Sequence, residues 1–123
     1  MIKGECLCGA VTFEVTDGAR GYSVCHCSQC RKQSGHTWAS GYAPEANIEI
    51  DGEVRWFAAT PLAKRGFCPT CGSSLFWKAH AEDTLSFALG AVDNPTGVTL
   101  QKHIFVADKG DYYEIADGLP QRP

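Results

Sequence analysis

Seven cysteines, gathered in three short clusters, constrain this chain more than any other feature of its sequence. The clusters are Cys6 with Cys8, Cys25 with Cys27 and Cys30, and Cys68 with Cys71. The 123 residues are close to the usual ~100 to 200 residues of one domain, so we expect residues 1–123 to form a single domain. Complete disulfide pairing would leave one of the seven thiols unpaired. If the seven cysteines instead divide into a group of four and a group of three, the two groups fit two common kinds of zinc site, one with four protein ligands and one with three.

Charge and hydropathy limit which partners the protein can bind and in which cellular compartment we expect it. The formal net charge is −3, and basic residues cluster only as the pairs Arg31-Lys32 and Lys64-Arg65, which excludes the basic surface of a nucleic-acid binder. No apolar run approaches the ~18 residues of a membrane span, and residues 1–10 hold no apolar stretch of signal-peptide length. We therefore expect a cytoplasmic protein with no membrane partner, in a compartment where disulfides are rare.

The hydropathy pattern predicts mostly strands. Residues 11–16 alternate apolar and polar side chains, and Asp51-Gly52 is a favourable hairpin turn between strands at 47–50 and 53–57. Further strands are expected at 22–26, 36–42, 73–78, 84–89 and 100–106.

Helical signals are few in this sequence. Ser28 could cap a short helix over residues 29–33, and a helical turn could follow Pro61. The predicted fold class is all-β, with several small antiparallel sheets cross-linked by a structural zinc. Small sheets give thin cores, which gain stability from metal cross-links.

The third cysteine cluster is typical of a zinc knuckle. Cys68 and Cys71 are separated by two residues, so a tight turn can aim both sulfurs at one ion. A structural zinc needs two more ligands, and Cys6 with Cys8 is the pair that remains if the middle cluster stays whole. Buried free thiols, or a disulfide between Cys68 and Cys71, are the alternatives.

The middle cluster has a different character. Cys25, Cys27 and Cys30 can converge from a six-residue window, and three protein ligands with an open fourth position are typical of a catalytic zinc. Strand alternation points His26 away from the neighbouring sulfurs. A thiol cluster without metal is the alternative, and such thiols would be prone to disulfide formation in air.

These motifs resemble those of the glutathione-dependent formaldehyde-activating enzymes, a family whose domain is shared with centromere protein V and is similar to the Mss4-like zinc fold. The matching segments are spread along nearly the whole chain and contain all seven cysteines. The segments are GECLCGAV at 4–11, CHCSQCRK at 25–32, GFCPTCG at 66–72, and the tail pieces KHI at 102–104 and DGLP at 117–120.

The resemblance implies two zinc ions and a reaction. The first and third clusters would hold a structural zinc, and the middle cluster a second, catalytic zinc. The name-giving activity adds glutathione to formaldehyde to give S-hydroxymethylglutathione, and relatives are grouped as carbon–sulfur lyases. The implied partners are thus a small thiol and a small aldehyde.

Elementary zinc chemistry agrees with this implication. Zn²⁺ with three thiolates carries a formal charge of −1, so it acidifies water poorly but suits a soft fourth ligand such as a substrate thiol. The hypothesis is a zinc-dependent carbon–sulfur lyase that adds a small thiol reversibly to a small aldehyde. The alternatives are a non-catalytic zinc module that binds a protein partner, and a thiol redox role for the middle cluster.

Four further residues are candidates for the site. Arg31 and Lys32 follow the middle cluster and could attract the carboxylates of a thiol such as glutathione, or else be solvated surface charges. Trp38 shares a strand face with His36 and Tyr42 and could form a pocket wall, unless it packs in the core. His103 could transfer protons near neutral pH, or be a hydrogen-bonded core histidine.

Overall fold

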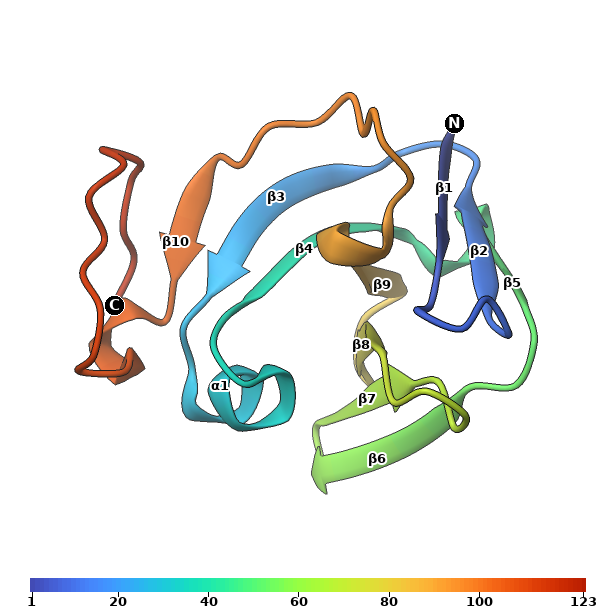
Figure 1. The fold of residues 1–123 in the computed structure, drawn as a ribbon, viewed down its shortest axis with the longest axis horizontal. Helices are drawn as coiled ribbons and strands as arrows, with labels where there is room; N and C mark the ends of the chain where they lie inside the picture. Colours follow the sequence, from blue (N-terminus) through green and yellow to red (C-terminus); the bar gives the residue numbers. More distant parts are fainter.

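The computed structural model describes residues 1–123 and contains two sheets (Figure 1). The smaller sheet is antiparallel, with the order β1 (Ile2–Glu5), β2 (Thr12–Val15) and β5 (Ile48–Asp51). The larger sheet has seven strands in the order β10 (Lys102–Ile104), β3 (Arg20–Cys25), β4 (Trp38–Pro44), β9 (Thr84–Ala88), β8 (Ser74–Ala79), β7 (Ala63–Phe67) and β6 (Arg55–Thr60).

The prediction of a mostly β fold is confirmed, and helical structure is short. The α-helix α1 (Ser28–Ser34) connects β3 to β4, and three 3-10 turns are η1 (Glu45–Asn47), η2 (Leu89–Ala91) and η3 (Val106–Asp108). The larger sheet is mixed, because β10 runs parallel to β3 while its other pairs are antiparallel. No helix has the length and apolar character that a membrane crossing would require.

The prediction of a hairpin around Asp51-Gly52 is wrong. The chain does turn there, and Gly52 has a positive φ of 101°, but the flanking strands belong to different sheets. β5 pairs with β2, whereas β6 pairs with β7. A turn motif sets only the local direction of the chain, and here the turn leads from the small sheet to the large one. Glycine is required at position 52 because a Cβ there would collide with the carbonyl oxygen of Ala10.

The segment around Pro61 also differs from expectation. Residues 61 and 62 form the turn of the β6–β7 hairpin instead of a helical turn. Proline favours the second position of a β-turn as much as the first turn of a helix, because its fixed φ suits both. The pairing of β6 with β7, a strand that the sequence did not predict, decides between them.

The helix α1 forms close to its expected position, with a different cap. Cys27, not Ser28, is the N-cap, because its backbone is extended and its sulfur accepts a hydrogen bond from the Cys30 amide at 3.3 Å. Gly35 ends the helix with a left-handed φ of 90°. The cap therefore brings the sulfur of Cys27 next to the first helical turn.

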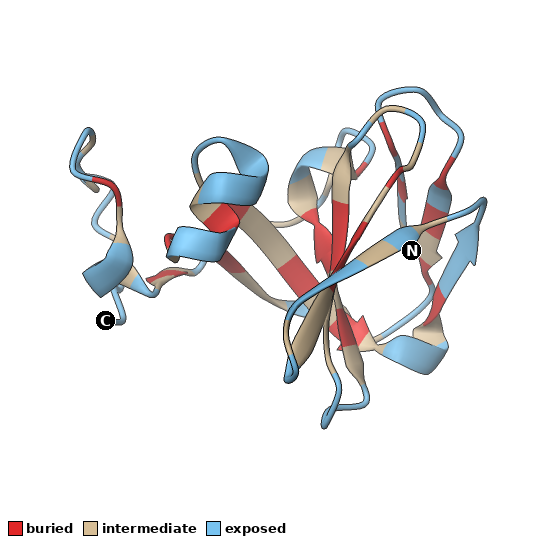
Figure 2. Cartoon of the chain, turned by 90° about the horizontal axis from the view of Figure 1, so that it is seen from below, coloured by how far each residue is buried: buried red, intermediate tan, exposed pale blue.

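Two buried clusters stabilise the fold. The larger joins the two sheets and centres on Phe13, Phe76 and Phe87, with the Phe13 and Phe76 rings 5.3 Å apart edge to face. The smaller lies where α1 packs on the large sheet and consists of Cys25, Cys30, Trp38 and Ala88. In Figure 2 the buried positions concentrate in the strands, and Cys30 is the buried position of α1.

Candidate metal centres and the adjoining pocket

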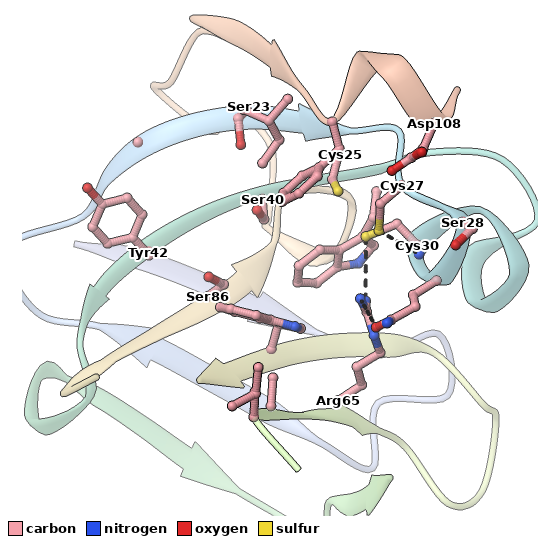
Figure 3. A pocket seen from close by; sticks show the side chains of 18 of the residues that line it. Ser23, Cys25, Cys27, Ser28, Cys30, Ser40, Tyr42, Arg65, Ser86 and Asp108 are labelled. Atoms are coloured by element: carbon pink, nitrogen blue, oxygen red, sulfur yellow. Dashed lines mark hydrogen bonds between the residues drawn. The ribbon is translucent and has the colours of Figure 1, made fainter. Parts of the chain in front are cut away.

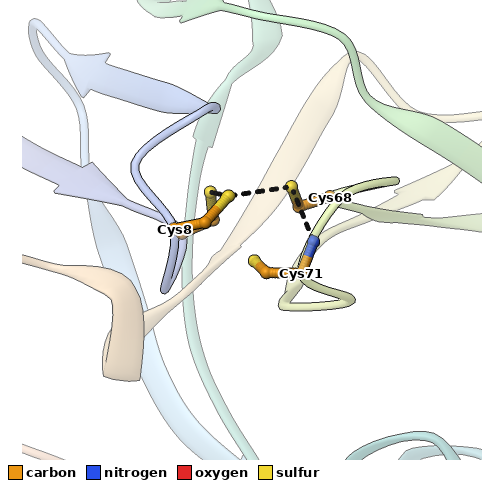
Figure 4. A group of neighbouring side chains, drawn as sticks. Cys8, Cys68 and Cys71 are labelled. Atoms are coloured by element: carbon orange, nitrogen blue, oxygen red, sulfur yellow. Dashed lines mark hydrogen bonds between the residues drawn. The ribbon is translucent and has the colours of Figure 1, made fainter.

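The cysteines of the first and third sequence clusters lie close together in the structure. The quartet of Cys6, Cys8, Cys68 and Cys71 has all its sulfur atoms within 4.8 Å of one another (Figure 4). The sulfur of Cys8 lies 3.7 Å from that of Cys6 and 3.8 Å from that of Cys68. All four thiols are free of disulfides. Four convergent thiols are the donor set of a structural zinc site, so the residues fit such an ion.

The quartet connects the two sheets. Cys6 and Cys8 lie in the turn that follows β1, and Cys68 and Cys71 lie in the connection between β7 and β8. Residues 7 and 8 form a turn, which brings the two sulfurs of this pair together. Gly9, with a φ of 80°, supplies the bend. A metal here would tie the small sheet to the large one.

Backbone and hydroxyl groups prepare the quartet for negative charge. The amide of Val11 donates to the sulfur of Cys6 at 3.2 Å, and the amide of Cys71 lies 3.5 Å from the sulfur of Cys68. The hydroxyl of Ser73, 3.2 Å from the sulfur of Cys71, lowers the pKa of that thiol to about 5. Such donors favour thiolates, the form that binds metal.

The second group of sulfurs comes from one short stretch of chain. The trio of Cys25, Cys27 and Cys30 also has its sulfurs within 4.8 Å of one another. Cys25 ends β3, Cys27 caps α1, and Cys30 lies in the first turn of that helix. Cys25 and Cys30 are buried and Cys27 is half-buried. The donor set suits a thiophilic metal with one side free of protein ligands.

Neighbouring groups give the trio unequal acidities. Hydrogen bonding with Cys25 and the positive charge of Arg65 lower the pKa of Cys30 to about 6. The same hydrogen bond, together with burial, raises the pKa of Cys25. The Nη1 atom of Arg65 lies 3.5 Å from the sulfur of Cys30 and donates to it. A metal bound at the trio would displace the protons that its thiols still carry.

The trio opens onto a cavity between α1 and the large sheet. This cavity has a volume of about 540 Å³, and Figure 3 shows the three cysteines among the residues that line it. Aromatic side chains and serine hydroxyls line the rest: Trp38, Tyr42, Trp77, Ser23, Ser40 and Ser86. Trp38 and Tyr42 both line the cavity, and Trp38 also belongs to the smaller buried cluster. His36 lies outside the lining and hydrogen-bonds the Tyr112 hydroxyl at 2.9 Å.

The charged residues of the cavity are ones that sequence reasoning missed. Arg65, Lys102 and Asp108 contribute to its lining, and Figure 3 shows Arg65 and Asp108 among the lining side chains together with the trio. Arg31 and Lys32, the expected substrate-binding residues, lie on α1 outside the lining. Arg65 was missed because β7 was not predicted, and Asp108 because nothing in its local sequence connects it with the cysteines.

Comparison with known proteins decides the family. The model of the glutathione-dependent formaldehyde-activating enzyme family matches residues 1–108. This chain belongs to that family. A Schizosaccharomyces pombe protein named an uncharacterized lyase is 26% identical over 121 residues, which cover 94% of this chain and 85% of the relative.

A solved structure shows a similar fold. The crystal structure of a Rhodobacter sphaeroides protein is 27% identical and superimposes with a TM-score of 0.57, covering 79% of this chain and 90% of the other. Family membership and the lyase-named relative support a lyase-like role for this formaldehyde-activating-enzyme family member. The two cysteine groups are where it could hold metal ions.

A chain of hydrogen bonds runs behind the trio in this family member. The His26 ring donates or accepts at both nitrogens: Nδ1 lies 2.6 Å from the Tyr113 hydroxyl and Nε2 lies 2.9 Å from Nδ1 of His103. Nε2 of His103 lies 2.8 Å from the Asp117 carboxylate. A carboxylate only accepts, so when both rings are neutral the hydrogen bonds run in one direction, from Tyr113 through His26 and His103 to Asp117.

This chain of hydrogen bonds fixes the place of both histidines. His26 has no nitrogen free for the trio's metal, and burial lowers its pKa, which favours the neutral ring. His103 is 6% exposed and lies outside the cavity lining. The C-terminal tail is held in the same way, since the His103 amide donates to the Pro120 carbonyl at 2.9 Å. The tail thus packs behind the residue between two of the trio's cysteines.

Proposed function

We propose that this protein is a zinc-dependent carbon–sulfur lyase that catalyses the reversible addition of a small thiol, such as glutathione, to a small aldehyde, such as formaldehyde. The observation that carries the proposal is the trio. Its three cysteines line a cavity of about 540 Å³, and no fourth metal-binding side chain belongs to the group. A pure scaffold site would have no use for three convergent thiols facing a cavity.

The metal assignment follows from donor chemistry. Thiolates select zinc among the common divalent ions of cells, so the quartet would hold one zinc and the trio a second. When bound at the trio, zinc supplies a soft Lewis acid that lowers the pKa of an incoming thiol. The quartet has all its positions filled by protein and would serve the fold alone.

The addition step requires one proton to move from sulfur to oxygen. The thiol loses its proton, the sulfur forms a bond to the aldehyde carbon, and the electron pair of the C=O π bond moves to oxygen, which takes the proton. Asp108 is the acidic side chain of the cavity lining, to which the trio also belongs. In our proposal its carboxylate receives the thiol proton and returns it to the new hydroxyl; the reverse sequence is the lyase reaction.

The other cavity residues would bind and orient the substrates. A cavity of about 540 Å³ has the size of sites that hold a ligand as large as a tripeptide thiol. Lys102 lines the cavity and, like Arg65, has no carboxylate partner in the structure; in our proposal it binds a substrate carboxylate. Trp38 and Trp77 supply apolar walls that exclude water.

The residues outside the lining have indirect roles in this proposal. His103 would position His26, and through it the loop of the trio, instead of transferring a proton to substrate. Arg31 and Lys32 would add positive potential near the cavity mouth. The need for seven reduced cysteines supports a cytoplasmic location.

The test is the rate of the uncatalysed equilibrium with and without protein. NMR exchange spectroscopy of formaldehyde with glutathione measures how fast S-hydroxymethylglutathione forms and breaks. We expect the metal-loaded protein to accelerate both directions equally, and Asp108→Asn to reduce the acceleration without changing metal content. If the fully metallated protein leaves the exchange rate unchanged, this substrate pair is ruled out.

A further inference from the structure

A buried positive charge beside the trio lacks an anionic partner. Arg65 is 7% exposed, and no carboxylate lies within ion-pair distance of it, since the ion pairs of the structure are Lys3 with Glu14, Lys78 with Glu45, and His103 with Asp117. A buried charge that is left unpaired costs several kcal/mol. The charge of Arg65 must therefore be balanced by an anion other than a carboxylate of the protein.

The contacts of Arg65 show where that anion can lie. Its Nη1 atom donates to the sulfur of Cys30 at 3.5 Å and to the Gln33 amide oxygen at 3.4 Å, and its Nη2 atom donates to the Gln29 amide oxygen at 3.2 Å. The two glutamines are neutral, so they satisfy hydrogen bonds but do not balance the charge. Among its partners only the trio can carry negative charge (Figure 3).

Buried side-chain donors without a partner belong to residues that neighbour the trio in the sequence, in the sheet or in the cavity. Three buried side-chain nitrogens in the molecule have no partner, and they are Nε of Arg31, Nε1 of Trp38 and Nε of Arg65. Trp38 pairs with Cys25 across β3 and β4, and Arg31 follows Cys30 in α1. All three donors therefore belong to residues around the trio. Unpaired donors concentrated around one site indicate that it is built to hold excess negative charge.

A charge count at the trio indicates which ligand brings that excess. Three thiolates and one divalent metal carry −1 in total, and a fourth, incoming thiolate makes the centre −2. We propose that Arg65 is the counter-ion for this extra charge and thereby makes the site selective for ligands that bind as anions through sulfur. The inference rests on the proposed function for its ligand class, and it assigns to Arg65 a role in ligand binding beyond holding α1.

The test uses cobalt, which replaces zinc and makes sulfur ligation visible. Cobalt-loaded protein, prepared without oxygen, is titrated with 2-mercaptoethanol, and the sulfur-to-cobalt charge-transfer absorption gives the dissociation constant. This thiol carries no other charge, so an effect of Arg65 must act on the bound sulfur. For Arg65→Gln we expect the dissociation constant to rise roughly 10- to 100-fold, the range of a lost hydrogen bond to a charged group. Arg65→Lys keeps the charge and should lose less than ~10-fold.

Gln33→Ala is the matched control. Gln33 accepts from the same Nη1 atom of Arg65 but does not line the cavity, so this variant loosens the clamp on α1 and keeps the charge. It should bind 2-mercaptoethanol like the wild type. Arg55→Gln, an exposed arginine of β6, controls for a change in net charge. The quartet's cobalt spectrum reports whether each variant is folded.

Three results would overturn the inference. One is unchanged 2-mercaptoethanol binding in folded Arg65→Gln. Another is equal weakening in Gln33→Ala, which would mean that Arg65 acts only through the helix. The third is a weakening for glutathione alone, which would mean that Arg65 binds a carboxylate. Because the titration needs no turnover, wild-type protein that binds thiols but fails to accelerate formaldehyde exchange would refute the proposed function and leave this inference standing.

Discussion

The two cysteine groups use the same ligand atom in opposite ways. The quartet brings together four sulfurs from two connections far apart in sequence, and two of its members belong to the main core between the sheets. The trio brings together three sulfurs from one short stretch and faces a cavity. In the function that we propose, the number of sulfurs and their surroundings, and not the residue type, separate a scaffold site from a reactive one.

The hydrogen-bond donors around the two groups differ in the same sense. Donors to the quartet come from its own loops, as with Val11 and Ser73, and the donors are neutral. The trio has a guanidinium from a distant strand beside it, and unpartnered donors on neighbouring residues. A neutral, locally closed shell suits a permanent centre, whereas a charged and unsaturated shell suits a centre whose charge changes during a reaction.

Removing a quartet ligand should have the largest effect. Structural zinc sites contribute roughly 10 to 16 kcal/mol in zinc-finger peptides, which exceeds the whole stability of most domains, about 5 to 15 kcal/mol. We expect Cys68→Ser to abolish cooperative thermal unfolding, as measured by circular dichroism, and to yield largely insoluble protein.

Cys8→Ser distinguishes the loss of a metal ligand from the loss of core packing in that experiment. Cys68 is fully buried, so its substitution also disturbs the core, whereas Cys8 is exposed. We expect Cys8→Ser to lower the Tm by more than 15 °C because it opens the quartet. A Tm within a few degrees of the wild type would show that the quartet does not support the fold through a metal.

The matched change in the trio should affect the reaction and leave the fold intact. Serine at position 27 keeps a good N-cap for α1, so we expect Cys27→Ser to cost less than about 1 kcal/mol of stability. The acceleration of formaldehyde–glutathione exchange should fall at least ~100-fold, since a metal ligand is lost. Exchange at the wild-type rate would exclude the trio from the reaction.

Chelation should remove metal from the two groups in a fixed order. The trio has three protein ligands and faces a cavity, whereas the quartet has four. A graded challenge with a chelator should therefore first remove one metal equivalent together with the exchange activity, at an unchanged circular dichroism spectrum. Simultaneous loss of activity and fold would contradict the separation of the two sites.

The smallest expected effect concerns the tail behind the trio. The hydrogen bond from the Leu119 amide, and then that from His103, lower the pKa of Asp117 below its ordinary 3.8. A lowered folded-state pKa stabilises the protein above pH ~4 and ceases to do so as the pH falls below it. The Tm difference between wild type and Asp117→Asn should thus be greatest at neutral pH and shrink toward pH 3.

Asp83→Asn, outside this hydrogen-bond chain, is the control for the pH series. It should show no such pH-dependent difference from the wild type. A constant Tm difference for Asp117→Asn across the series would mean that the tail is not anchored through the charge of Asp117.

The sequence predicted the grouping of the cysteines because metal-ligand spacing is a strong local signal. Cys68 and Cys71 lie in a tight turn, and once the trio is kept whole one pair remains to complete the quartet. The mostly β character followed from alternation in the same way. These features depend on a few neighbouring residues, so one chain is enough to detect them.

What the sequence did not predict depends on contacts between distant segments. The turn at Gly52 was expected, but which sheet each neighbouring strand would join depends on the partners β2 and β7. Arg65 reaches the trio only because the large sheet places β7 across the cavity from β3. The chain from Tyr113 to Asp117 forms only when the tail folds back along β10.

Counting metal ions in single variants tests the central claim most directly. Native mass spectrometry of protein purified without oxygen should find two zinc ions per chain in the wild type and one in Cys27→Ser, whose fold is retained. Two zinc ions in that variant, or a single ion in the wild type that persists in it, would contradict the assignment of a scaffold quartet and a separate reactive trio.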